Sequence, residues 1–120
     1  MIRRNITEEQ AKVIMEKGDI PEDFRRYSRK VAVVLTQGWC PPWRAMNSYL
    51  SRLEWEKTDS EIVGFVLVYD RLSFFYDFMR FKESRFHNDH IPYVRFYRDG
   101  GFVGDSNYIG EPDFLHILKD

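Results

Sequence analysis

The sequence has only one cysteine, Cys40, among its 120 residues. One cysteine cannot form an internal disulfide, and it excludes zinc sites built from several cysteines. Such sparse use of cysteine is typical of proteins from a reducing compartment, so we expect a cytoplasmic protein.

Long hydrophobic runs are also missing. The two most apolar stretches, Val31–Leu35 and Ile62–Tyr69, are far shorter than the roughly 20 residues that span a bilayer. The chain begins Met1-Ile-Arg-Arg-Asn-Ile-Thr-Glu-Glu, where acidic residues precede any apolar run. We therefore expect no secretory signal and no membrane partner.

The chain has little net charge, because 18 basic residues face 19 acidic ones and the net charge is −1. Without a basic excess, the composition gives no reason to expect a nucleic-acid partner. The sequence also lacks a Gly-x-Ser-x-Gly motif, a phosphate-binding glycine loop and a dinucleotide fingerprint. These absences exclude the common hydrolase and nucleotide-binding signatures.

Material for a hydrophobic core is plentiful, since 43 % of the residues are hydrophobic and 17 % are aromatic. The length and the absence of any linker predict one domain, residues 1–120. Thr7 and Gln10 have the spacing of a capping box, and Gly18 is a stop signal, which predicts a helix between them. In order, we predict a helix at Glu8–Lys17, a short helix at Glu22–Ser28, a strand at Val31–Leu35, a helix ending near Trp55, a strand at Ile62–Tyr69, a helix at Leu72–Phe86, strands at Tyr93–Tyr97 and Phe102–Asp105, and a last helix after Gly110.

This order predicts an α/β fold. Two strands joined by a long helical crossover should be parallel, with a right-handed connection. The last two strands are joined by the tight turn Arg98-Asp-Gly-Gly and must be antiparallel. We therefore expect a mixed four-stranded central sheet with helices on both faces.

Cys40 lies where a predicted buried strand gives way to a helix. Unpaired N–H groups and the helix dipole stabilise a thiolate at such a position, and Arg44 could add to this effect. Pro41 and Pro42 stiffen the turn but remove two N–H donors. The alternative is that Cys40 is an inert, buried side chain.

The stretch Trp39-Cys40-Pro41-Pro42-Trp43-Arg44 resembles the active-site motif of thioredoxins, and Ile91-Pro92 resembles the cis-proline step of that family. The resemblance runs from about Val31 to the C-terminus. It implies the thioredoxin fold, a catalytic role for Cys40, and a partner-binding groove formed by Trp39, Pro41, Pro42, Trp43, Ile91 and Pro92.

The chain departs from the thioredoxin pattern at three positions. Trp43 replaces the second cysteine, Val34 replaces the buried acid, and an apolar residue near Val66 replaces its lysine partner. Cys40 can therefore form a mixed disulfide but cannot resolve it internally.

Two functions fit these residues. In the first, Cys40 performs monothiol exchange with a protein disulfide, with glutathione as a candidate co-substrate and no other cofactor. In the second, the protein is a non-catalytic module that binds a protein partner in the groove around Trp39, Trp43 and Pro92. Trp43 is either such an anchor or a core residue, and the aromatic helix around Phe74–Phe81 is either packed or a dimer contact, so monomer and homodimer both remain open.

The histidines allow two weaker hypotheses. His90 could approach Cys40 as a base or an ion-pair partner. His87, His90 and Cys40 could together bind zinc, although this is only a partial ligand set, so we predict no metal.

Overall fold

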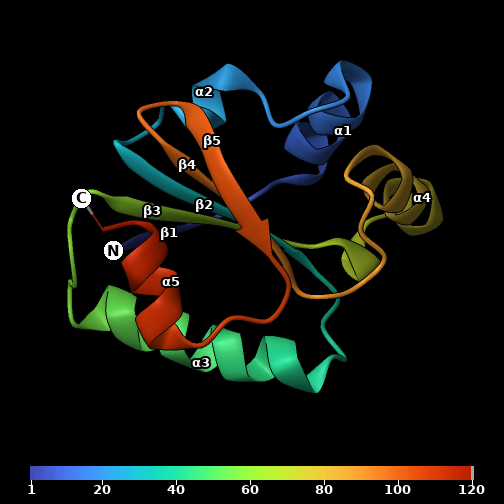
Figure 1. Ribbon diagram of the computed structural model, residues 1–120. Helices are drawn as coiled ribbons and strands as arrows, with labels where there is room; N and C mark the ends of the chain where they lie inside the picture. The colour runs from blue at the N-terminus through green and yellow to red at the C-terminus, as the bar shows by residue number, and fades with distance from the viewer. Residues whose placement is uncertain (120) are drawn as a thin grey trace.

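A computed structural model describes residues 1–119 and contains a five-stranded mixed sheet (Figure 1). The strand order is β1-β3-β2-β4-β5; β1 and β2 are parallel to β3, whereas β4 is antiparallel to both β2 and β5. The strands are β1 (Ile2–Asn5), β2 (Lys30–Thr36), β3 (Ile62–Val68), β4 (Tyr93–Arg98) and β5 (Gly101–Ser106).

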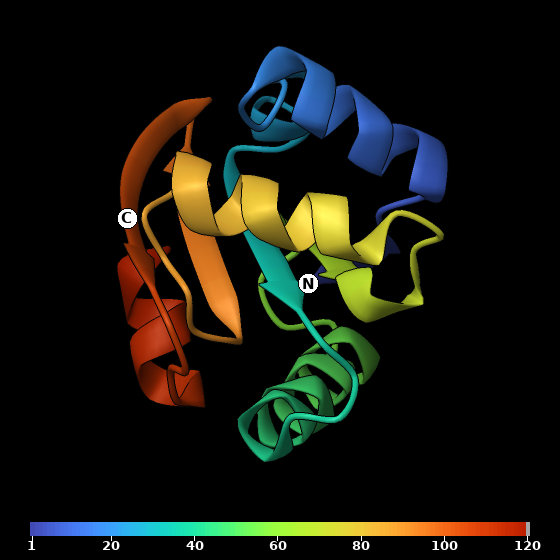
Figure 2. The ribbon, with the colours of Figure 1, turned by 90° about the vertical axis from the view of Figure 1, so that its right-hand side faces the viewer.

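Helices cover both faces of this sheet (Figures 1 and 2). Helices α3 and α5 lie on one face, and α1, α2 and α4 lie on the other. Their bounds are α1 (Glu8–Lys17), α2 (Glu22–Arg25), α3 (Pro41–Trp55), α4 (Phe75–Arg85) and α5 (Glu111–Ile117), with a 3₁₀ turn, η1 (Tyr69–Arg71), after β3. This confirms the expected mixed sheet with helices on both faces.

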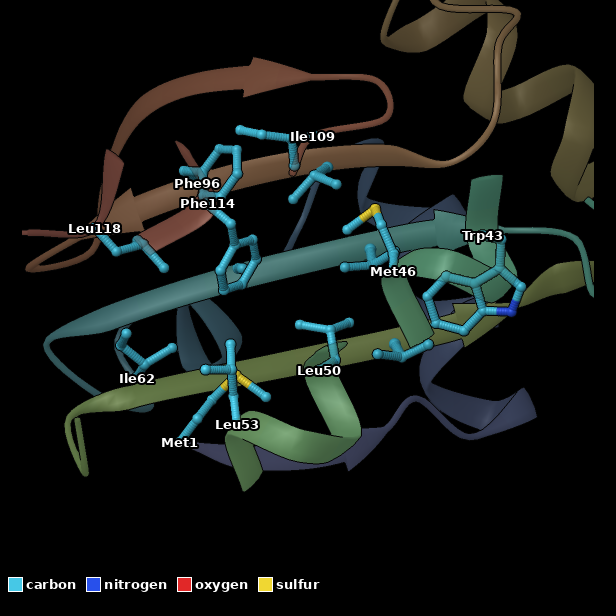
Figure 3. Close-up of a cluster of buried hydrophobic side chains, with 14 of the residues drawn as sticks. Met1, Trp43, Met46, Leu50, Leu53, Ile62, Phe96, Ile109, Phe114 and Leu118 are labelled. Carbon is cyan, nitrogen blue, oxygen red and sulfur yellow. The ribbon is translucent and has the colours of Figure 1, made fainter. Parts of the chain in front are cut away.

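The central strand β2 is buried along its whole length because both of its faces are covered. Ala32 and Val34 point into the core under α3 and α5, while Val31, Val33 and Leu35 point into the core under α1 and α4. Figure 3 shows the first of these cores, with side chains of α3 lying between the helix and the sheet.

Helix α1 has the ends that its sequence predicts. The Thr7 hydroxyl accepts from the Gln10 N–H at 3.1 Å, the Gln10 side chain accepts from the Thr7 N–H at 2.8 Å, and Gly18 ends the helix with φ +73°. Reciprocal bonding of this kind satisfies two otherwise unpaired donors, which is why the boundaries agree with the sequence prediction.

Three elements differ from the prediction by more than one residue. Helix α2 ends at Arg25 rather than at Ser28, because Arg26 is its C-cap residue. The sheet has a fifth strand, β1, which pairs with β3 although none of its four residues is buried. An edge strand with so few inward-facing residues gives no alternating apolar pattern. The predicted helix Leu72–Phe86 begins later, at Phe75, because residues 72–74 form a bend and a turn after η1.

The aromatic side chains of α4 are largely packed. Phe78 is fully buried, and Phe74, Phe75 and Phe81 pack partly buried against the same core, while Tyr76 is 66 % exposed. The core interpretation of this helix therefore holds for its phenylalanines. Among residues 1–119, no helix is both long enough and apolar enough to cross a membrane.

Two tryptophans of α3 provide a test of this packing. Trp43 is 4 % exposed in the core under α3, whereas Trp55 is 85 % exposed at the end of the same helix. We expect Trp43→Ala to lower the free energy of unfolding by about 3–5 kcal/mol, because it empties a core site. Trp55→Ala should stay within about 0.5 kcal/mol of the parent. Urea unfolding followed by circular dichroism measures both values, and equal losses would contradict this packing.

Candidate functional site around Cys40

The topology of the sheet brings Cys40 next to Pro92. Strand β2 ends at the edge of the sheet where the antiparallel strand β4 begins, and Leu35 is paired with Tyr93. The segment after β2 and the segment before β4 therefore meet at this edge. The Cys40 thiol donates to the carbonyl oxygen of Ile91 with an Sγ···O distance of 3.7 Å, and the Ile91–Pro92 peptide bond is cis.

Cys40 is the N-cap residue of α3, a helix of 15 residues, and its own carbonyl accepts from the Arg44 N–H at 3.1 Å. Pro41 and Pro42 occupy the next two positions and carry no N–H. Trp43 is therefore the first residue of the helix with a backbone donor. The helix dipole still places positive potential at this end, but only part of the usual set of N–H groups is present to face the sulfur.

The turn before Cys40 is held by two hydrogen bonds to residues of η1. The Gly38 N–H donates to Asp70 Oδ1 at 3.0 Å, and Gln37 Nε2 donates to the Tyr69 hydroxyl at 3.2 Å. Trp39 Nε1 donates to Gln37 Oε1 at 2.6 Å, yet the Trp39 side chain is 61 % exposed. Trp39 is thus a large apolar surface directly beside a thiol whose residue is only 4 % exposed.

Trp43 does not line a groove, which corrects its placement among the partner-binding residues. It is buried beside Met46, Leu50 and Leu53, which recur at helical spacing and face the sheet (Figure 3). The Arg3 guanidinium lies 5.7 Å from the Trp43 ring centroid and covers it from the side of β1. Of the two tryptophans around Cys40, only Trp39 is on the surface.

The floor beneath Cys40 is apolar. Val34 is paired with Val66 on one side and with Val94 on the other, and all three belong to the core cluster that includes Cys40. Each of the three is at most 2 % exposed. Val34 stands where the resemblance to thioredoxins expects the buried acid, and Val66 lies in the region where it expects the lysine partner, so both of these positions beneath the thiol are apolar.

The auxiliary residues stay at the surface. Pro41, Pro42 and Arg44 are exposed on the first turn of α3. His90 is exposed as well, with its Nδ1 3.4 Å from Asp89 Oδ1. The hydrogen-bond partner of Cys40 Sγ is the Ile91 carbonyl rather than His90.

The zinc hypothesis finds no support in the part of the chain that the structure describes. No three His, Cys, Asp or Glu side chains of residues 1–119 are grouped so that they could hold a metal ion.

Lys82 is a residue near this site that the sequence prediction missed. Its side chain is fully buried, and its Nζ donates to the His90 carbonyl and, at 3.2 Å, to Asn88 Oδ1. Burial lowers the pKa of Lys82 to about 8, because a desolvated ammonium loses its hydration. The available signal was its spacing, since Lys82 comes four residues after the buried Phe78 on the same face of α4.

Comparisons with known proteins agree with this architecture. No protein-family model matches the chain, and no curated protein matches it either. Among solved structures, the chain is similar to thioredoxin O1 from Arabidopsis thaliana in its oxidised state, with a TM-score of 0.65 and 16 % identity over 98 % of this chain and 95 % of that one.

Two further structures give the same result. Thioredoxin O2 from Arabidopsis thaliana, also oxidised, matches with a TM-score of 0.66 and 11 % identity over 97 % of this chain and 90 % of that one. Thioredoxin from Fasciola hepatica matches with a TM-score of 0.61 and 16 % identity over 96 % of this chain and 95 % of that one. At such low identity the likeness shows the fold, and the chain therefore has the thioredoxin fold.

Proposed function

We propose that the protein forms mixed disulfides through Cys40 and that an external thiol resolves them. The observation that carries this proposal is the position of Cys40 Sγ, at the start of α3 and 3.7 Å from the Ile91 carbonyl. A partner that places a disulfide at this turn would bring its backbone beside Ile91 and Pro92, with Trp39 as an exposed contact.

The chemistry balances without a second cysteine in the chain. The Cys40 thiolate attacks one sulfur of the partner's disulfide, the S–S bond breaks, and the other sulfur leaves as a thiolate that takes up a proton. A second thiol, such as glutathione, then attacks the partner's sulfur as its thiolate. A disulfide forms between glutathione and the partner, and Cys40 leaves as a thiolate that takes up the proton released by the attacking thiol. Because Cys40 is only 4 % exposed, the first step requires the residues that cover it to move.

Glutathione suits this site as the external thiol because it carries two carboxylates. Arg44 is exposed four residues after Cys40. Arg71 Nη2 lies 3.7 Å from the position that a Cβ atom on Gly38 would occupy, so this guanidinium lies close to the turn before Cys40. The negatively charged Asp70 carboxylate lies at the same turn and accepts from the Gly38 N–H. The two guanidinium groups provide positive charge near the turn that carries Cys40.

Incubation with oxidised glutathione tests the reaction. We expect one glutathione to bind covalently to the wild-type protein, to disappear on addition of reduced glutathione, and to be absent in Cys40→Ser, because Cys40 is the only thiol. Intact-mass spectrometry under native conditions measures all three. A wild-type protein that stays unmodified while it is oxidised readily after unfolding would rule the reaction out.

A non-catalytic binding module is the second candidate, and the burial of Cys40 favours it. The same site offers an exposed Trp39 beside a covered thiol and an apolar floor with no group to handle protons. Exposed tryptophans are frequent anchors in protein interfaces.

Capture of partners by the wild type, Cys40→Ser and Trp39→Ala separates the two candidates. Covalent partners should be lost in Cys40→Ser and released from the wild type by reducing agent. Partners of a binding module should survive Cys40→Ser and weaken on Trp39→Ala by about 2 kcal/mol, because an interface anchor is removed. Quantitative mass spectrometry of the eluted proteins reads out both patterns, and Trp55→Ala serves as the control for an exposed tryptophan away from Cys40.

A further inference from the structure

The loop that brings Ile91 to Cys40 is held by a network of three side chains from separate parts of the chain. Lys82 comes from α4, Asn88 from the loop itself, and Asn107 from the segment after β5. Figure 2 shows the chain leaving α4 and passing to the start of β4, which is the stretch that this network holds.

Asn88 is the centre of the network. Its Oδ1 accepts from Lys82 Nζ at 3.2 Å, from Asn107 Nδ2 at 2.9 Å and from the His90 N–H at 3.1 Å. Its Nδ2 donates to Asn107 Oδ1 at 3.0 Å, so the two amides bond reciprocally. An acceptor that serves three donors can hardly move without breaking several hydrogen bonds at once.

The network fixes the peptide groups on both sides of Ile91. Lys82 Nζ donates to the His90 carbonyl, and Asn107 Nδ2 donates to the Pro92 carbonyl at 3.2 Å. Between these two held carbonyls lies that of Ile91, which accepts from Cys40 Sγ. The position of the Ile91 oxygen therefore follows from its two neighbours.

Lys82 holds this loop from a fully buried position, which is rare for a lysine. The side chain is fully buried, and its Nζ lies 5.4 Å from the Tyr93 ring centroid. Glu83 and Asp89 are the acidic residues whose charge acts on it, and desolvation still lowers its pKa. An ammonium in such a place needs good acceptors, and the loop carbonyl and the Asn88 amide supply them.

We propose that Lys82, Asn88 and Asn107 are positioning residues. They hold the Ile91 carbonyl at the place where it accepts the hydrogen bond from the Cys40 thiol. This inference rests on the proposed function for its consequence, because the same loop would receive the partner's backbone. The hydrogen bond between the Cys40 thiol and the Ile91 carbonyl can be measured without the exchange reaction.

The single cysteine makes that contact observable. The S–H stretching band in the infrared spectrum belongs to Cys40 alone, and its frequency rises when the hydrogen bond to an acceptor weakens. We expect Lys82→Met, which keeps the aliphatic stem, to shift this band to higher frequency. Lys12→Met is the matched control, since Lys12 is exposed on α1 and lies 5.6 Å from the Phe74 ring centroid; it should leave the band unchanged.

Asn107→Ala provides a second route to the same result, because it releases the Pro92 carbonyl from the other side of Ile91. If Lys82→Met does not fold, the S–H band of Asn107→Ala tests the same inference. An unchanged S–H band in a cooperatively folded variant of Lys82 or Asn107 would overturn the inference, since the contact would then be independent of the network.

The glutathione reaction shows whether this positioning matters chemically. Formation of the glutathione adduct should slow by about tenfold or more in Lys82→Met and stay at the wild-type rate in Lys12→Met, because misplacement of reacting groups slows a reaction strongly. If the wild type forms no adduct, the proposed function fails while the infrared comparison still decides the positioning. If the band shifts but the adduct rate stays the same, the loop positions the thiol without a role in the exchange, and the consequence is overturned.

Discussion

The antiparallel pairing of β2 with β4 is the constraint on which the candidate site depends. A strand parallel to β2 would begin at the opposite edge of the sheet, so only β4 can start where β2 ends. Its register is enforced from both faces. Val94 and Phe96 lie in the core under α3, whereas Arg95 lies on the other face with its guanidinium 4.5 Å from the Phe86 ring centroid and 4.3 Å from that of Phe102. A slip by one residue would turn Arg95 into the apolar core under α3, and the cost of an unpaired buried charge excludes it.

The apolar floor limits what the thiol can do. With valines at positions 34, 66 and 94 and Trp43 packed into the core, the described residues 1–119 place only uncharged side chains beneath Cys40, and none of them is a second thiol. The polar groups that act on the thiol are then those at the N-terminal end of α3 and the Ile91 carbonyl. The proposed exchange therefore depends on an external thiol, because a chain with one cysteine has no second thiol for an internal resolving step.

The sequence predicted the elements whose signals are local. The capping box at Thr7, the β-branched run of β2 and the tight turn before β5 each carry their own pattern, and the structure has an element at each of them. The sequence did not predict β1, because only its pairing with β3, about 60 residues away, makes it a strand. The resemblance to thioredoxins located Cys40 and Pro92, but not the burial of Trp43, since a tryptophan on an amphipathic helix fits a core and a surface equally well before its neighbours are known. Lys82 was missed because lysine is almost never fully buried unless it is paired, and its acceptors lie in a loop that composition alone marks as polar.

The loop before β4 also connects the two hydrophobic cores that lie on opposite faces of the sheet. Cys40 belongs to the core under α3, and Lys82 stacks over Tyr93, which belongs to the core under α1 and α4. Ile91 is the residue that packs against both cores, and its carbonyl is the one that Cys40 contacts. A change in the packing of α4 therefore has a short physical route to the thiol, through Lys82 and the His90 peptide group rather than through the sheet. Since packed interiors shift between discrete arrangements instead of deforming smoothly, a partner that moves this loop would act on α4 and on the thiol together.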